Sequence, residues 1–442
     1  MTMQVYIYHG TTTIDLQASG CAVLDGYFPN VAQTPEQHVT DTIQCRFIGS
    51  EADARALINS INMALRTAQG QKDQDTDETS TWLYFEMAGD DTEWRSRIYD
   101  GVMSFSDKLD HNWRRRKLDF TLTIERQGYW EGPVTNVPLV NDNSVTASAA
   151  LTIYDCNDGT GSPPAKRQFF AVVDGNDVDG DLPGPAIFTI EPDQAINALI
   201  IGQYVDERAL GTYPLAHIEA ESLTCAKAST QTSGAASNGE YAQIDLDIAS
   251  ITMTGTYTLD NFRGSYIRVF GHFFTPPPAD TWMEAIFMSE DVVIAQTPKV
   301  KLSADLIQSL GIVRLPNIYL TTPLTAADLQ INITCPGTSG HLDFDVLYLI
   351  GVDYYTELVS SKTAIEGIIH EEWGNQRLSY LTVERGEATV KMTYFDQESG
   401  EGIYLEPGLD QKLFFLFMGN GDAEITWKIS TLCSYRPRRL AL

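Results

Sequence analysis

The sequence has few basic residues and no long apolar run. Its 442 residues include 30 Lys and Arg against 59 Asp and Glu, which gives a formal net charge of -29. Surfaces that bind nucleic acid or anionic lipid are normally basic, so neither is expected as a specific partner. Without a stretch of about 18 apolar residues, no transmembrane helix is expected. The acidic charge fits plain solubility, a saline habitat, or a surface that DNA passes without adhering.

Cysteine is sparse and scattered. A zinc site or a small disulfide framework needs closely spaced cysteines, and no CxxC pair is present. We therefore expect reduced, mostly buried thiols in a protein made in a cytoplasm. The N-terminal stretch alternates like a strand and lacks a basic region followed by an apolar one, so no signal peptide is expected. The six cysteines are Cys21, Cys45, Cys156, Cys225, Cys335 and Cys433.

Sequence patterns of catalysis are also missing. There is no HExxH, no GxSxG, no Walker loop and no GxGxxG after a strand. Carboxylate pairs are too common in a chain with 59 acids to indicate glycoside hydrolysis. We expect no enzyme activity, no cofactor and no metal. The acidic loops 73–80 and 174–181 both fail the EF-hand template, although a weak irregular calcium site at 174–181 stays an alternative to a solvated loop.

The pattern that is present is alternation of apolar and polar residues, which is typical of strands. One helix interrupts it, because residues 51–68 place their apolar side chains at helical spacing. Ser50 with Asp53 is a plausible N-terminal cap, and Gly70 a plausible stop. The strands predicted before Pro133 are Gln4–Tyr8, Thr42–Ile48, Trp82–Met87, Ile98–Phe105 and Leu118–Glu125.

Four segments follow from changes in composition. The fragment PAIFTIEPDQAINALIIGQ predicts two strands around a turn. Short strands with polar turns then indicate a β-sandwich of jelly-roll type. Near the end, Asn420-Gly421 between two alternating runs predicts a hairpin. The segments are 1–135, 136–205, 206–355 and 356–442.

Two basic runs stand out against the acidic background. One holds Arg114, Arg115, Arg116 and Lys117; the other is YRPRR at 435–439. Each is interpreted either as a contact with an acidic neighbour, including another copy of the chain, or as charge that guards a solvated strand edge.

Aromatic residues are the remaining candidates. Tyr129 and Trp130 in ERQGYWEGP look like a sugar platform or a packing anchor, and their place at the end of the first segment favours the anchor. In segment 206–355, Trp282, Tyr213 and Tyr241 are candidates for stacking on sugar rings, with core packing as the alternative. Trp282 follows the PPPAD loop, where burial explains an aromatic less easily.

Three fragments in order carry a resemblance to a known family. TLTIERQGYWEGP resembles the end of the N-terminal belt domain of siphophage distal tail (Dit-like) and minor tail proteins. GPAIFTIEPDQAINALIIGQ resembles the opening strands of their galectin-like domain, and IYLEPGLDQKLFFLF with AEITWKISTLCSYRPRRL its closing strands. The chain departs from the family in segment 206–355, which resembles a jelly-roll carbohydrate-binding module.

This resemblance implies a mainly β protein with a belt-type domain carrying one helix, a discontinuous galectin-like sandwich and an inserted jelly-roll sandwich. It implies a structural protein of the virion, assembled in the host cytoplasm as a homohexameric ring between the tail tube protein and a tail hub or tip protein. DNA would pass through the ring lumen, and outward modules would contact host-surface glycans. The alternative is a glycan-binding receptor-binding protein or lectin-like adhesion module without ring assembly.

Overall fold

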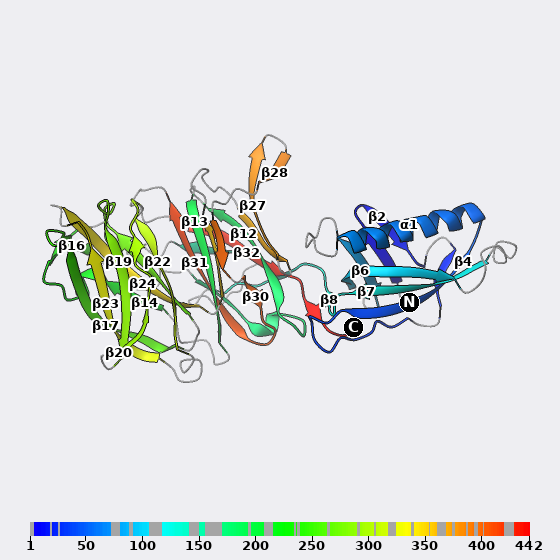
Figure 1. Ribbon diagram of the computed structural model, residues 1–442, viewed down its shortest axis with the longest axis horizontal. Coiled ribbons are helices and arrows are strands. Elements are labelled where there is room, and N and C mark those ends of the chain that lie inside the picture. Colours follow the sequence, from blue (N-terminus) through cyan, green and yellow to red (C-terminus); the bar gives the residue numbers. More distant parts are fainter. Residues whose placement is uncertain are drawn as a thin grey trace.

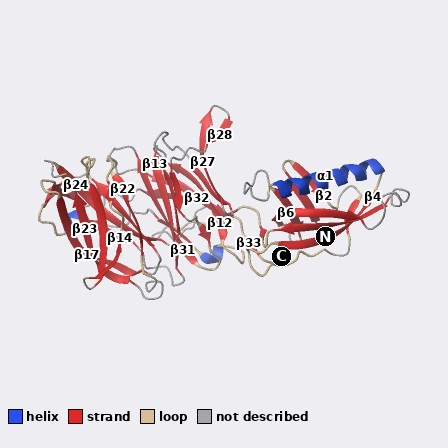
Figure 2. Ribbon diagram, in the orientation of Figure 1, coloured by secondary structure: helices blue, strands red, loops and turns tan. Residues whose placement is uncertain are grey.

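The computed structural model shows three β-rich parts in a row (Figure 1). A first domain lies at one end, a sandwich made from two separate chain segments lies in the middle, and a second sandwich lies at the far end. Strands dominate the described residues, as Figure 2 shows, which confirms the predicted mainly β class. The described residues are 4–17, 20–24, 27–71, 80–87, 92–105, 117–140, 150–154, 170–192, 196–206, 215–233, 236, 239–262, 266–289, 292–304, 306–316, 324–336, 340–352, 354–359, 368–373, 376–385, 388–392, 397–400, 402–419 and 428–442.

The first domain is built on one nine-stranded sheet. Its main path runs β2-β1-β5-β6-β7-β4-β3, and β8 and β33 attach beside β6. All five strands predicted for this part of the chain are present. The bounds are β1 Gln4–His9, β2 Thr12–Asp15, β3 Cys21–Val23, β4 Val39–Ile48, β5 Thr81–Glu86, β6 Glu93–Phe105, β7 Lys117–Arg126, β8 Trp130–Glu131 and β33 Arg438–Arg439.

Helix α1 (Glu51–Gly70) begins where the sequence predicts. The side-chain oxygen of Ser50 accepts a hydrogen bond from the backbone N–H of Asp53 at 3.2 Å, which satisfies a donor that the first turn leaves free. Gly70 is still helical, so the helix is slightly longer than predicted. The N–H of Gln71 then closes it by donating to two carbonyls of the last turn.

One face of the sheet is covered by α1 (Figure 1). Ile61, Ala64 and Leu65 are buried there and belong to the core of the first domain. Gly101 of β6 permits this close packing, because a Cβ added to it would lie 2.7 Å from the Leu65 side chain. Among the described residues, no helix is long and apolar enough to cross a membrane.

The middle sandwich has an eight-stranded and a five-stranded sheet. The first has the path β10-β32-β12-β26-β27-β28, with β30 on β12 and β9 on β32; the second runs β11-β31-β13-β25-β29. The bounds are β9 Thr135–Val137, β10 Ala150–Tyr154, β11 Phe170–Val173, β12 Gly184–Pro192, β13 Ile196–Asp206, β25 Tyr354–Val359, β26 Ile368–Trp373, β27 Gln376–Arg385, β28 Ala388–Met392, β29 Gln397–Gly400, β30 Tyr404–Leu405, β31 Asp410–Gly419 and β32 Lys428–Tyr435.

The hairpin predicted at Asn420-Gly421 is wrong. The turn residues lie outside the described part of the chain, but the flanking strands β31 and β32 belong to different sheets. Strands β12 and β13, which follow one another in sequence, also belong to different sheets. Each of these strands has an apolar face toward the shared core, so consecutive strands cross between layers and complete both sheets.

The far sandwich uses only strands β14 to β24, between two strands of the middle sandwich that pair with each other, β13 and β25. One sheet runs β15-β16-β24-β18-β22 with β14 on β24, and the other β17-β23-β19-β20 with β21 on β19. The bounds are β14 Leu215–Glu219, β15 Ala228–Thr232, β16 Glu240–Asp245, β17 Ser250–Phe262, β18 Tyr266–Phe273, β19 Trp282–Ser289, β20 Val292–Gln296, β21 Val300–Lys301, β22 Ile307–Arg314, β23 Leu324–Thr334 and β24 His341–Val352.

Sequence reasoning missed β17, although it has 13 residues. Its inward-facing positions include Gly255, which interrupts the apolar alternation. A Cβ on Gly255 would lie 2.5 Å from Leu223, so Leu223 occupies the space that a larger side chain would fill.

Candidate functional site

Two stretches of chain cross side by side from the first domain to the middle sandwich. On the sandwich side β9 pairs with β32, and on the domain side β8 pairs with β33. Between these pairs the N–H of Gly132 donates to the carbonyl of Pro437 at 2.8 Å. The junction is therefore a double-stranded ribbon. We call residues 130–137 and 433–439 together the junction ribbon.

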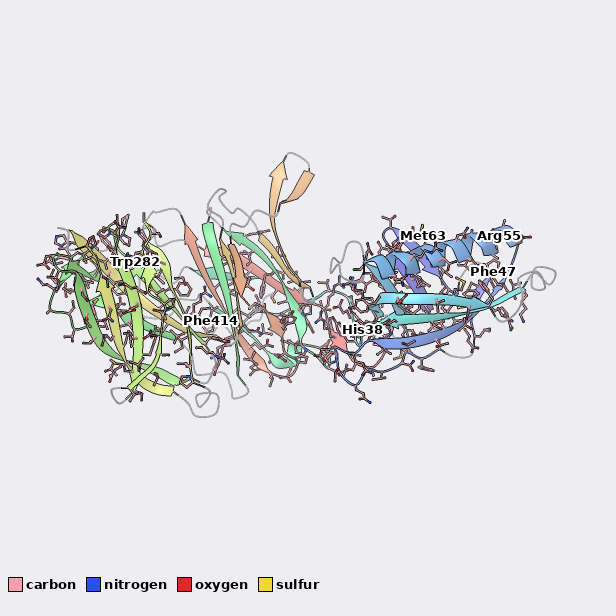
Figure 3. The ribbon with its side chains drawn as sticks, viewed as in Figure 1. His38, Phe47, Arg55, Met63, Trp282 and Phe414 are labelled. Carbon is pink, nitrogen blue, oxygen red and sulfur yellow. The ribbon has the colours of Figure 1, made fainter. Side chains whose placement is uncertain are left out.

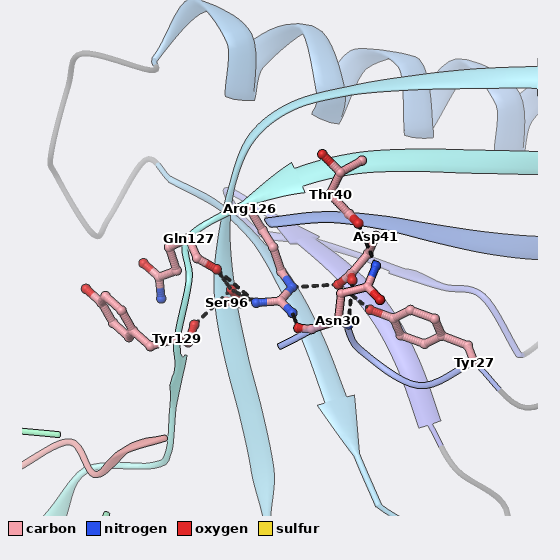
Figure 4. A network of polar contacts seen from close by, with 8 residues as sticks. All are labelled: Tyr27, Asn30, Thr40, Asp41, Ser96, Arg126, Gln127 and Tyr129. Carbon is pink, nitrogen blue, oxygen red and sulfur yellow. Dashed lines mark hydrogen bonds and ion pairs between the residues drawn. The ribbon is translucent and has the colours of Figure 1, made fainter. Parts of the chain in front are cut away.

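Arg126, at the end of β7, is fully buried beside the junction ribbon (Figure 4). Its Nε donates to Oδ2 of Asp41 at 2.6 Å, and neither side chain is exposed. Asp41 also accepts hydrogen bonds from the hydroxyl of Tyr27 and the backbone N–H of Asn30. The guanidinium lies 4.4 Å from the centre of the Trp130 ring. This network ties the loop before β4 to the end of the first sheet.

Glu131 is the centre of a second buried cluster. Arg438 donates to its Oε1 at 2.9 Å, and Arg95 donates to its Oε2 at 3.2 Å. Burial by itself would raise the pKa of Glu131, but the charges of Arg438, Arg95 and Arg436 outweigh that effect and hold the pKa below its ordinary value. The carboxylate is thus ionised and shared by Arg95 of β6 and Arg438 of β33, which are far apart in the sequence.

The aromatic pair lies in the same place. Trp130 is fully buried in the core of the first domain. Tyr129 lies under the guanidinium of Arg438, 4.5 Å from it, and burial raises its pKa. Arg439 lies over Trp94 at 4.7 Å. ERQGYWEGP and YRPRR, which the sequence offers as separate features, therefore form one contact.

The acidic neighbour of YRPRR is Glu131 of the same chain. Of the other basic run, residues 114–116 lie outside the described residues. Lys117 begins β7 and forms an ion pair with Asp119 at 3.0 Å. Arg46 forms a second ion pair with the same carboxyl group at 2.8 Å. The hydrogen bond from Arg46, together with Lys117, lowers the pKa of Asp119.

Sequence reasoning missed the pair of Asp41 and Arg126. A usable indication was present, since both occupy inward-facing positions of alternating strands. Asp41 shares the buried face of β4 with Ile43, and Arg126 shares that of β7 with Ile124. Opposite charges at apolar positions of neighbouring strands predict a buried ion pair.

The three aromatic candidates for sugar stacking differ in their surroundings. Tyr213 lies outside the described residues. Tyr241 stacks against Phe274 with ring centres 4.3 Å apart, so one face of its ring is occupied. Trp282 begins β19 and is 38% exposed, the most accessible aromatic among the described residues of the far sandwich (Figure 3).

An acidic cluster lies at the start of the far sandwich. Burial, with the nearby charges of Glu219 and Asp345, raises the pKa of Glu221 to about 7. Asp345 is fully buried and contacts Nδ1 of His272 at 2.8 Å. This cluster has no counterpart among the sites that the sequence predicts.

Residues 174–181 are held by hydrogen bonds within the segment and to the end of the chain. A short 3-10 helix covers Gly175–Asp177, and Asp174 accepts from the backbone N–H of Asn176 at 2.8 Å. The N–H of Gly175 donates to Asp410. Across the part of the chain that the structure describes, no group of three or more His, Cys, Asp or Glu residues is placed to hold a metal ion.

No family model and no curated protein matches this chain. Solved structures with a partial likeness include a Podospora anserina β-(1,4)-mannanase with a family 35 module (14% identity, 31% of this chain and 28% of that chain, TM-score 0.22). A second is the C-terminal family 6 module of a marine laminarinase from Zobellia galactanivorans (12% identity, 31% of this chain and 98% of that chain, TM-score 0.22). A third is the enzymatically active domain of bacteriophage CBA120 tailspike protein 4 (16% identity, 32% of this chain and 20% of that chain, TM-score 0.19). At these scores the likenesses carry no argument about family or function.

Proposed function

We propose that this chain is a structural component of a siphovirus-like phage tail tip. It forms a homohexameric ring that joins the tail tube to the tip or baseplate hub, and its sandwich modules face outward. The observation that carries the proposal is the arrangement in Figure 1, with the first domain at one end and a separately folded sandwich at the other. The junction ribbon holds the first domain to the middle sandwich, as an adaptor under load requires.

The proposed partners are other copies of the chain, the tail tube protein and a hub or tip protein. The protein is assembled in the host cytoplasm and becomes part of the virion. DNA passes through the ring lumen without specific binding, and the net charge of -29 supports that role because a polyanion is repelled. The proposed chemistry is assembly, without catalysis, cofactor or membrane contact.

Ring formation is tested by mass photometry and by negative-stain class averages of the purified protein. We expect sixfold rings, because a head-to-tail interface with closed rotation produces a cyclic assembly. The measurement is repeated with the tail tube protein as a template. Monomers or trimers alone under both conditions contradict the proposal.

The basic run is the proposed site of contact between subunits. A variant that combines Arg114→Glu, Arg115→Glu and Arg116→Glu should abolish ring formation and leave the melting temperature of the monomer unchanged. The matched control is Arg55→Glu on the exposed face of α1, where the native arginine forms an exposed pair with Glu51 of its own helix. Rings that form equally well with both variants remove the basic run from the interface.

A second candidate function is that of a glycan-binding receptor-binding protein without ring assembly. The exposure of Trp282 on the far sandwich favours it. Under this alternative the protein binds glycan as a monomer or trimer, whereas six weak sites on one ring gain strength from multivalency. The oligomeric state of the glycan-bound protein distinguishes the two.

A further inference from the structure

The outward face of the five-stranded sheet in the far sandwich carries polar side chains in register across three strands. Burial alternates along β19, so Trp282, Glu284 and their alternate neighbours point away from the core. Trp282 is paired with Thr334 of β23, and Thr334 with Ser250 of β17. One step along the strands, Glu284 is paired with Asn332, and Asn332 with Thr252.

The second of these rows is held together by side-chain hydrogen bonds. Nδ2 of Asn332 donates to Oε1 of Glu284 at 2.9 Å, and the hydroxyl of Thr252 donates to Oδ1 of Asn332 at 3.1 Å. Gln330 donates to the same oxygen at 2.9 Å. The amide and the carboxylate are therefore fixed in place before any ligand arrives, which reduces the entropy lost on binding.

The first row places an aromatic ring beside this fixed polar group. Trp282 is 38% exposed, although the solvent side of a sheet is normally occupied by polar residues. On its other side, β19 pairs Trp282 with Lys301, whose Nζ forms an exposed ion pair with Asp280 at 2.7 Å. An exposed indole next to rigid amide and carboxylate groups matches what a sugar ring requires, since the ring has an apolar face and a rim of hydroxyls.

We propose that this outward sheet face, with Trp282 as the stacking platform and Glu284, Asn332 and Thr252 as hydrogen-bonding groups, binds a neutral glycan. The acidic charge of this face selects the class of glycan. Glu284, together with Asp328 two rows further along the same face, repels uronic acids and phosphate-bearing polymers. Hydroxyls of a neutral sugar can donate to Glu284 and accept from the amide. The inference rests on the proposed glycan role of the far sandwich and is independent of ring assembly.

The other sheet of the same sandwich offers a rival position at Tyr241. Its ring is stacked on Phe274, and the nearby carboxylate of Asp343 accepts hydrogen bonds from Gln243 and Thr275. With one ring face covered by Phe274, Tyr241 presents less of its ring to a ligand than the exposed Trp282 does.

Affinity gel electrophoresis of the full chain against neutral polymers (a β-glucan, a mannan, a xylan and a galactan), with polygalacturonate as the anionic comparator, tests the inference. We expect retardation by at least one neutral polymer and none by polygalacturonate. Trp282→Ala and Thr252→Val should each weaken binding, the first by about tenfold, as expected for the loss of an aromatic anchor. Val292→Ser, at a 64% exposed position of the same sheet, is the matched control and should bind normally.

Melting curves of each variant separate lost binding from lost folding. Normal binding by a folded Trp282→Ala, with loss in Tyr241→Ala, overturns the choice of face and leaves the glycan role intact. Failure of the unaltered protein to bind any neutral polymer overturns the glycan role itself. Neither result bears on ring assembly, which the oligomeric state measures.

Discussion

At the scale of single residues, the most consequential groups are charged side chains buried at the junction. Moving a charge out of water is costly, and only a well-placed partner offsets that cost. Asp41 with Arg126 and Glu131 with two arginines meet this condition through short, multiple hydrogen bonds. Removal of one member leaves the other charged and buried.

Glu131→Gln tests this reasoning. The substitution preserves shape but removes the charge that Arg438 and Arg95 share, so the free energy of unfolding should fall by about 3–5 kcal/mol. Urea unfolding followed by tryptophan fluorescence measures it. The control Glu51→Gln removes an exposed pair with Arg55 and should cost under about 0.5 kcal/mol. A loss below about 1 kcal/mol for Glu131→Gln would mean that the cluster contributes little.

Alanine substitutions at Trp130 and Trp282 should have opposite effects on stability and on glycan binding. Trp130→Ala empties a fully buried site and should lower the free energy of unfolding by about 3–5 kcal/mol. Trp282→Ala should leave stability almost unchanged and weaken only glycan binding. Denaturant unfolding and gel retardation are measured on both variants. The anchor interpretation of Trp130 fails if its loss changes glycan binding alone.

Glu221 should make the stability of the far sandwich depend on pH. The folded pKa of about 7 lies above the ordinary value of 4.5, so the folded state prefers the protonated form. The resulting stability is complete below about pH 4.5 and is lost as the pH rises through 7. Glu221→Gln should therefore be the more stable form at pH 8, by on the order of 1 kcal/mol after allowance for its partial exposure, and the advantage should shrink toward pH 5.

Unfolding midpoints of both proteins at pH 5 and pH 8 measure the effect. Glu36→Gln, at an exposed acid of the first domain, is the control and should show no such pH-dependent gain. Equal midpoints for Glu221→Gln and the unaltered protein at pH 8 would contradict the raised pKa.

At the scale of elements, the start of α1 is set by residues next to it in sequence, whereas its position on the sheet is set by distant ones. Its first turn depends on Ser50, and its place on the sheet depends on apolar side chains that meet β6. Ser50→Ala should lower the free energy of unfolding by about 1 kcal/mol, because the N–H of Asp53 loses its acceptor. Thermal unfolding followed by circular dichroism at about 222 nm, the usual helix band, measures this loss of stability. Ser60→Ala, within the helix, is the comparison and should not destabilise, since alanine is the better helix former.

At the scale of the whole molecule, the junction ribbon joins parts that are far apart in sequence. Arg438 and Glu131 are separated by 307 positions, so the first domain is complete only when the segment after β32 has returned to it. Asp181 and Leu182 also donate backbone hydrogen bonds to the carbonyl of Arg438. The first domain and the middle sandwich should consequently unfold together.

A chain that ends at Tyr435 lacks β33 and keeps only the β9–β32 half of the ribbon. Differential scanning calorimetry should then show two separate transitions, with that of the first domain at the lower temperature, because buried Glu131 loses its ion pair with Arg438. A chain that ends at Arg439 keeps β33 and serves as the control. An unchanged thermogram for the shorter chain would mean that the ribbon does not couple the two parts.

Much of the fold could be predicted because its cause is local. Alternation in Leu118–Glu125 and capping at Ser50 identify a strand and a helix without reference to anything distant. Where an inward position holds Gly255 or Asp41, the alternation is interrupted, and the reason lies in a neighbouring strand or loop. The stacking candidates could be named from sequence, but the difference between Tyr241 and Trp282 depends on Phe274, which only the folded chain places there.

By itself, the sequence determined the mainly β class, the five strands predicted before Pro133, the start of α1 and the scarcity of basic residues, since each depends on residues close together in the chain. Only the tertiary structure decided that β31 and β32 lie in different sheets and that YRPRR meets ERQGYWEGP. The physical reason is that backbone hydrogen bonds are the same for every strand. The alternation of apolar and polar residues indicates which face of a strand is buried. Which strand it pairs with depends on how whole faces pack and on which buried charges neutralise one another.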